Sequence, residues 1–145
     1  MILASTCKAA APETVYGASK LIGERIVLNA GGTVGRLFNV VESSRNVFKI
    51  WGDAVAAGEP MLVCGGTRRY YISLAEAVSF LLALADVPSG RYAPNPGLSV
   101  RASVMAKRFA ADHPHKIIEP RRGDRLSEPL YAPHERTVPY GKMMR

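Results

Sequence analysis

The chain has 145 residues, of which 48% are hydrophobic and 21% charged, a composition that argues against long disorder, collagen-like repeats and coiled coil. Its length fits one domain, and no apolar run approaches the roughly 20 residues that span a bilayer. Nineteen Lys and Arg against 12 Asp and Glu give a net charge of +7. This charge favours an anionic partner without choosing among nucleic acid, a lipid surface and a phosphate-bearing small molecule.

The cysteines and histidines indicate neither a disulfide framework nor a metal site. Cys7 and Cys64 are too few and too far apart in the sequence for either. His113 and His115 form a His-x-His pair, but no cysteine or acidic cluster completes a ligand set, so we interpret them as loop residues. We therefore predict no metal, a reducing compartment and, since the chain has no membrane segment, a cytoplasmic location.

The first half of the chain alternates between strand and helix patterns. The predicted elements are, in order, a strand over 2–5, a helix over 15–30, a strand over 33–41, a helix over 47–57 and a strand over 61–64. The side of the first helix that helical spacing defines carries Ala18, Leu21, Ile22, Arg25, Ile26 and Asn29. Strands separated by helices indicate crossover units in a doubly wound parallel sheet, so we predict an α/β fold.

The second half continues this alternation and then becomes basic and rich in proline. The predicted elements are a helix over 74–85, a strand over 91–92, a helix over 100–111, a strand over 116–119 and a surface-wrapping tail over 120–145. Ser73 precedes the first of these helices and Glu76 follows three residues later, which predicts a capping box. We expect the whole chain to form one partial domain.

Tyr16 and Lys20 lie four residues apart at the start of the first long helix, so their side chains share a face. A neighbouring ammonium lowers the pKa of a phenol, which makes tyrosinate a usable base for a hydroxyl proton. Thr6, at the end of the first strand, could hydrogen-bond the same hydroxyl. The spacing alone is weak, because a tyrosine and a lysine on a half-exposed helix face would produce it too.

The Tyr16–Lys20 pair belongs to a series of motifs that together cover nearly the whole chain. They are Ser5-Thr6-Cys7-Lys8-Ala9, Tyr16-Gly17-Ala18-Ser19-Lys20, the segment from Arg36 to Ser43, the segment from Arg69 to Ser73 and the segment from Arg121 to Glu128. In this order they resemble the extended short-chain dehydrogenase/reductase superfamily, in particular the CapD-like group of polysaccharide biosynthesis, whose members are UDP-N-acetylglucosamine 4,6-dehydratase-like. The resemblance implies the carboxyl-terminal portion of a Rossmann-type fold that modifies nucleotide sugars.

The resemblance also implies catalytic roles. Thr6, Tyr16 and Lys20 would serve oxidation of the sugar C4 hydroxyl by a bound NAD(P), which makes Tyr16 and Lys20 cofactor-binding residues as well. Lys8 would be a second base near C5 during elimination of water. Cys7 stands where the group has an aspartate, and a thiol is a poor donor of a proton to a leaving hydroxyl. The elimination step is therefore in doubt, whereas oxidation and reduction at C4 remain possible.

The binding residues implied by the resemblance fit a UDP-sugar. Asn39, Arg69 and Arg121 would approach the diphosphate, because guanidinium forks match phosphate oxygens in pairs, and Asp124 would approach the ribose. The alternative is that these arginines are solvated surface. Glu42 replaces a glycine of the group and would add negative charge beside this site.

The sequence contains no glycine-rich turn between a strand and a helix, the element that holds a dinucleotide in this fold. We expect the half of the fold that carries this turn to be missing, and the exposed sheet edge to cause self-association or pairing with a partner segment. A second hypothesis is a truncated, non-catalytic remnant that binds nucleotide sugars or oligomerises. Nucleic-acid binding is disfavoured, because the one cluster of arginine and tyrosine at 68–71 is short.

Overall fold

The computed structural model describes residues 1–44, 46–121, 123–132 and 137–139. The first elements along the chain are β1 (Ile2–Thr6), the 3₁₀ turn η1 (Cys7–Ala9), α1 (Val15–Asn29), β2 (Thr33–Leu37), β3 (Asn39–Val40), α2 (Val47–Ala56), β4 (Met61–Cys64) and β5 (Arg68–Arg69). The remaining elements are β6 (Tyr71–Ile72), α3 (Leu74–Ala83), the 3₁₀ turn η2 (Leu84–Asp86), β7 (Gly90–Ala93), β8 (Val100–Arg101), α4 (Ala102–Phe109), β9 (His115–Ile118) and β10 (Thr137–Pro139).

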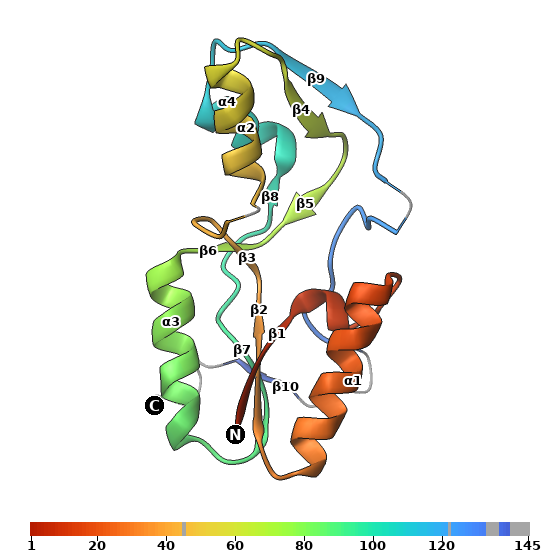
Figure 1. Cartoon of the computed structure of the whole chain (residues 1–145), viewed down its shortest axis with the longest axis vertical. Helices are drawn as coiled ribbons and strands as arrows, with labels where there is room; N and C mark the ends of the chain where they lie inside the picture. Colours follow the sequence, from red (N-terminus) through yellow and green to blue (C-terminus); the bar gives the residue numbers. More distant parts are fainter. Residues whose placement is uncertain (45, 122, 133–136, 140–145) are drawn as a thin grey trace.

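A parallel sheet with the strand order β1-β2-β7-β10 forms the centre of one part of the molecule. Helices α1 and α3 lie on opposite sides of this sheet (Figure 1). Strand β2 is buried over 33–36 because it lies between two strands and beneath both helices. Parallel strands connected through helices confirm the predicted α/β, Rossmann-type class.

The other part of the molecule is built on the parallel pair β4–β9. Helices α2 and α4 pack against it, and Trp51, Met61 and Val63 are fully buried between them. The Trp51 indole N–H donates a hydrogen bond to the Leu62 carbonyl (2.9 Å), which satisfies its polar group inside this core. The short pairs β3–β6 and β5–β8 join the two parts (Figure 1).

Helix α1 buries a different side from the one that carries Ile22 and Ile26. Ile22 and Ile26 are each 62% exposed, whereas Gly17, Glu24 and Val27 are buried. The reason is electrostatic: the Glu24 carboxylate accepts hydrogen bonds from groups of the sheet, so a charged residue faces the core. The side that carries Ile22 and Ile26 is therefore the outer side of α1.

Three predicted boundaries also differ. The strand predicted over 33–41 divides at Phe38, because β3 leaves the main sheet to pair with β6. The helix predicted over 100–111 begins only at Ala102, since Val100 and Arg101 pair antiparallel with β5. The helix predicted over 74–85 ends at Ala83 and continues as η2, while its predicted capping box between Ser73 and Glu76 is confirmed.

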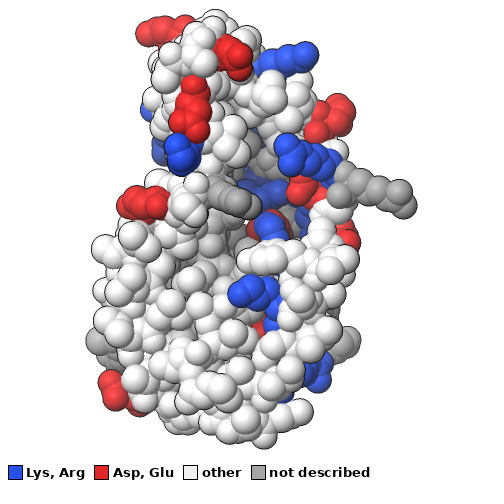
Figure 2. Space-filling view, in the orientation of Figure 1, with Lys and Arg blue, Asp and Glu red and all other residues white. Residues whose placement is uncertain are grey.

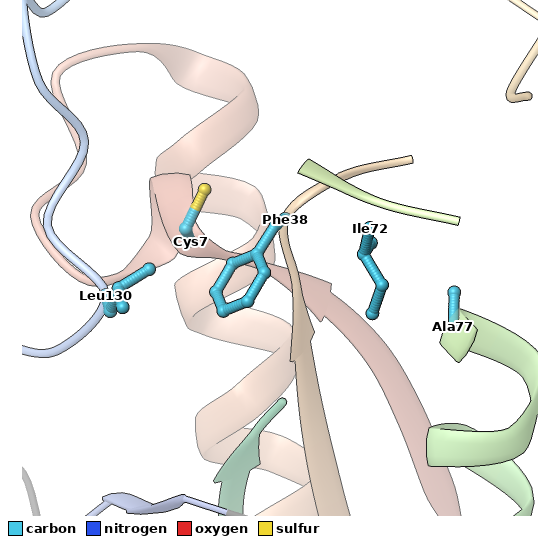
Figure 3. Close-up of a cluster of buried hydrophobic side chains, with 5 residues drawn as sticks. All are labelled: Cys7, Phe38, Ile72, Ala77 and Leu130. Carbon is cyan, nitrogen blue, oxygen red and sulfur yellow. The ribbon is translucent and has the colours of Figure 1, made fainter. Parts of the chain in front are cut away.

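A small core cluster lies where the two parts meet (Figure 3). Its members come from distant parts of the chain and are Cys7, Phe38, Ile72, Ala77 and Leu130. The ring of Phe38 lies between Cys7 and Ile72 in this view (Figure 3).

The segment after residue 120 contacts the core through Leu130, and β10 pairs with β7 further along the chain. The assignment of 120–145 as a surface-wrapping tail stays a prediction. Within the described ranges, no helix combines the length and the apolar character that crossing a membrane requires.

Candidate functional site

Three of the predicted catalytic residues, Thr6, Cys7 and Lys8, follow one another at the carboxyl end of β1. Thr6 caps η1, and its hydroxyl oxygen accepts a hydrogen bond from the Lys8 backbone N–H (3.4 Å). Cys7 is buried beneath this turn. Lys8 is 37% exposed and pairs with the carboxylate of Glu128. The turn thus buries Cys7 and Ala9 and leaves Lys8 partly exposed.

The start of α1 brings Tyr16 and Lys20 close to this turn. Thr14 caps the helix by accepting a hydrogen bond from the Gly17 N–H (3.1 Å). A Cβ at Gly17 would lie only 2.7 Å from the Lys8 carbonyl oxygen, so glycine allows the close approach of the helix to η1. The Lys20 ammonium donates a hydrogen bond to the Ala4 carbonyl of β1 (3.2 Å).

A pocket of about 350 Å³ collects the predicted catalytic residues. Those that line it are Thr6, Cys7, Lys8, Tyr16 and Lys20. Tyr16 is 54% exposed, and within the described part of the chain its hydroxyl has no hydrogen-bond partner. This hydroxyl is therefore available to a ligand. We call this cavity the reaction pocket.

A second pocket, of about 440 Å³, collects the predicted binding residues Asn39, Arg69, Arg121 and Asp124. Its apolar wall comes from Phe48, Trp51, Tyr71 and Ile118. Trp51 and Phe48 thus belong to a core and also border a cavity. The Asp124 carboxylate accepts a hydrogen bond from the Arg121 backbone N–H (3.2 Å), so a tight turn presents both residues. We call this cavity the nucleotide-side pocket.

The two pockets adjoin, because Asn39 and Ser43 line both. The Asn39 amide donates a hydrogen bond to the Tyr70 carbonyl (3.1 Å), which fixes it at the boundary. Figure 2 shows a hollow between the two parts of the molecule, with lysine, arginine and acidic side chains around it. The nine predicted site residues therefore lie around one composite cavity.

Glu128 is the residue of this site to which sequence reasoning gave no role. It is 7% exposed, and its carboxylate accepts a hydrogen bond from the Cys7 thiol (3.0 Å) and pairs with Lys8 and with Arg69 (Nε to Oε1, 3.4 Å). Burial, the largest single influence, raises its pKa, but hydrogen bonds from Cys7 and Lys8 and the charges of Lys8 and Arg69 outweigh burial and lower it. Only the motif from Arg121 to Glu128 signalled this residue.

The contact with Glu128 also affects the pKa of the Cys7 thiol. Burial raises the pKa of its thiol to about 12, and the negative charge of Glu128 adds to this rise. The thiol is therefore protonated at neutral pH, and its hydrogen is directed to Glu128. Cys7 has no free proton to offer the reaction pocket in this arrangement.

Glu42, Arg68 and Arg125 bind other groups of the protein itself. Glu42 lines neither pocket, and its carboxylate accepts a hydrogen bond from the Leu74 N–H (2.7 Å) at the first turn of α3. Arg68 and Arg125 bind other groups, the former Ser99 and the latter Glu13. Arg122 lies outside the described residues. Among the residues that are described, no three His, Cys, Asp or Glu side chains lie close enough together to hold a metal ion.

The parallel sheet with helices on both sides is a Rossmann-type fold. Residues 1–145 match the family described as polysaccharide biosynthesis protein, and the chain belongs to this family. It is 30% identical to a UDP-N-acetylglucosamine 4,6-dehydratase (inverting) of Campylobacter jejuni subsp. jejuni serotype O:23/36 (strain 81-176), over 96% of the chain and 45% of that protein. The chain thus spans about half the length of this curated relative.

Solved structures share the fold. Pen from Bacillus thuringiensis aligns with a TM-score of 0.77 and 18% identity, over 90% of this chain and 46% of that one. UDP-glucuronic acid 4-epimerase from Bacillus cereus, in complex with UDP-glucuronic acid and NAD, aligns with a TM-score of 0.71 and 14% identity, over 90% and 51%. The resemblance drawn from the sequence motifs is confirmed at the level of family and fold.

Proposed function

We propose that this chain carries the nucleotide-sugar site of an enzyme that oxidises the C4 hydroxyl of a UDP-sugar with NAD(P), in the manner of the dehydratases and epimerases it resembles. The observation that carries the proposal is the junction of two pockets at Asn39 and Ser43. A diphosphate in the nucleotide-side pocket would leave its sugar directed toward Tyr16. Two of the proteins named above, the Campylobacter jejuni dehydratase and the Bacillus cereus epimerase, are UDP-sugar enzymes, which supports this ligand class.

The nucleotide-side pocket suits a uridine diphosphate in shape and charge. Arg69 and Arg121 supply guanidinium groups for phosphate oxygens, and Asn39 supplies an amide. Asp124 is an acceptor for ribose hydroxyls. The apolar wall around Phe48 and Tyr71, both of which are partly exposed, gives a planar base a surface to contact. The net charge of +7 agrees with an anionic ligand.

In the reaction pocket we assign Tyr16 as the base for the C4 hydroxyl proton. Lys20 contributes positive charge on the same helix face, and Thr6 contributes a hydroxyl that can bind the sugar oxygen. The chemistry that a bound NAD(P) would supply here is that of a hydride acceptor for C4. The residues present, Tyr16 and Lys20, fit the nicotinamide end of such a cofactor, and these 145 residues contain no glycine-rich turn for its pyrophosphate.

Position 7 decides how far the reaction proceeds. Elimination of water across C5 and C6 needs a base near C5, for which we assign Lys8, and an acid for the leaving hydroxyl. The buried Cys7 thiol is a poor acid at neutral pH, because its pKa is raised to about 12. We therefore propose oxidation and reduction at C4, as in an epimerase, ahead of full dehydration.

Calorimetry tests the binding part of this proposal. UDP-N-acetylglucosamine should give saturable heat with the purified chain, and Arg121→Ala should weaken binding about tenfold, because Arg121 is exposed and its loss removes one charged phosphate contact. Uridine serves as the control that lacks phosphate. Absence of heat at millimolar UDP-sugar would contradict the proposal.

A second candidate is a non-catalytic module that binds nucleotide sugars or oligomerises. Two observations favour it: the protonated Cys7, and strand β1, which among the described strands pairs on one side only, with β2. An unpaired parallel edge favours self-association or pairing with another segment of the fold. Titration with NADH separates the candidates: a fluorescence change supports cofactor binding, and no change excludes catalysis by this polypeptide alone. Sedimentation as a stable monomer would contradict the self-association.

A further inference from the structure

The Glu128 carboxylate contacts residues of both pockets. Arg69 lines the nucleotide-side pocket, while Cys7 and Lys8 line the reaction pocket, and all three contact Glu128. Its backbone is held in place, since the preceding Ser127 bridges to Arg68 of β5. Because this buried carboxylate contacts residues of both pockets, a change in its interactions on one side can alter its interactions on the other side.

The three contacts are not equivalent. Lys8 and the Cys7 thiol bind Glu128 at hydrogen-bond distance, whereas Arg69 Nε lies 3.4 Å from Oε1. Glu128 would therefore keep two partners if Arg69 moved away, so its buried charge would stay compensated. Arg69 itself also donates hydrogen bonds to the Arg68 and Leu126 carbonyls. Arg69 is thus the partner that Glu128 can exchange.

We propose that Glu128 is a positioning residue that couples the two pockets by competing with an anionic ligand for Arg69. The ligand class rests on the proposed function, since it is the diphosphate of a nucleotide. A diphosphate that engages Arg69 weakens the Arg69–Glu128 pair, and the Glu128 carboxylate then interacts more strongly with Lys8 and Cys7. Binding in the nucleotide-side pocket is in this way transmitted to the reaction pocket.

The competition predicts the sign of a mutational effect. Glu128→Gln removes the competing charge and frees Arg69, so diphosphate should bind about threefold to tenfold more tightly than to the wild type. A merely structural role for Glu128 predicts the opposite, because a damaged site binds more weakly. Asp53→Asn removes the same charge from an exposed carboxylate that pairs with Lys49 on α2, and it should leave the affinity nearly unchanged.

The two cysteines of the chain supply a direct readout of the coupling. Cys64 lines the nucleotide-side pocket and Cys7 touches Glu128. In protein labelled with ¹³C at the cysteine Cβ, inorganic pyrophosphate should shift both signals in the wild type, with the same dissociation constant. In Glu128→Gln it should shift the Cys64 signal alone, since the connection to Cys7 is lost.

Each outcome of this titration decides a claim. The coupling would be overturned if saturating pyrophosphate did not shift the Cys7 signal of the wild type. It would also be overturned if a folded Glu128→Gln variant bound pyrophosphate more weakly than the wild type. The wild-type measurement does not depend on the variant's folding. Pyrophosphate coupling without any binding of UDP would support Glu128 as the link and overturn the nucleotide-sugar function. Binding of neither probe would overturn both.

Discussion

Glu24 of α1 binds Arg36 of β2 through both carboxylate oxygens, at 2.8 Å from Nε and 2.7 Å from Nη2, and both side chains are fully buried. Glu24 also accepts hydrogen bonds from Ser5 of β1 (2.5 Å) and Arg91 of β7 (2.8 Å). One carboxylate therefore joins the helix that carries Tyr16 and Lys20 to three strands of the sheet. The geometry of the reaction pocket depends on this buried network.

Glu24→Gln should destabilise the protein by about 3 to 5 kcal/mol, because it removes the charge that two guanidinium groups share inside the fold. Urea unfolding followed by circular dichroism measures the change. Asp53→Asn is the matched control: it removes a carboxylate from an exposed pair and should cost about 0.5 kcal/mol or less. Equal effects of the two substitutions would contradict the structural role of Glu24.

Gly17→Ala should destabilise the protein by about 1 to 3 kcal/mol, since a Cβ there would lie 2.7 Å from the Lys8 carbonyl oxygen. The helix would have to move away from η1, which would also open the reaction pocket. Gly52→Ala in α2 is the matched control, because its Cβ would lie 3.8 Å from Phe109. That substitution should instead stabilise by about 0.5 to 1 kcal/mol through helix propensity.

Cys7 should make stability depend on pH in the alkaline range. Its pKa is raised from 9.0 to about 12 in the folded protein, so its contribution is complete below pH 9 and is lost as the pH rises toward 12. The free energy of unfolding should fall by up to about 1.4 kcal/mol per pH unit through this one group. Comparison with Cys7→Ser isolates the effect, because the hydroxyl does not ionise in this range. Identical pH profiles would refute it.

Cys7→Asp should add a second pH dependence of the same sign in the acid range. The new carboxylate would lie against Glu128, and two carboxylates in contact raise the pKa of one of them. A raised pKa in the folded state means that the variant is most stable at low pH and loses stability, relative to the wild type, as the pH rises from 4 to 8. Thermal melts across this range provide the measurement. A difference between the two proteins that does not vary with pH would show that the carboxylates do not meet.

The sequence predicted the elements of the fold because strand and helix patterns are local. The motifs also singled out the two groups of residues that line the two pockets, whereas the catalytic and binding roles of these residues stay predictions. The inward side of α1 could not be predicted, because the apolar residues Ile22 and Ile26 gave no sign that Glu24 would be buried by partners on β1, β2 and β7.

Glu128 shows the other limit of sequence reasoning. Its partners Cys7 and Lys8 lie 121 and 120 residues away in the chain, and spacing carries no information about such contacts. The pKa of Cys7 could not be predicted either, because it depends on burial and on this distant carboxylate. What the sequence did contain was the acidic residue itself, at the end of the last motif.

Trp51 offers the most direct measurement of the nucleotide-sugar site, because it is the only tryptophan of the chain and lines the nucleotide-side pocket. Titration with UDP, with excitation at a wavelength that the uracil does not absorb, should change its emission in a saturable manner, and Arg121→Ala should shift the midpoint to about tenfold higher concentration. Emission that does not change up to millimolar UDP, or a curve that Arg121→Ala leaves unaltered, would contradict the assignment of this pocket.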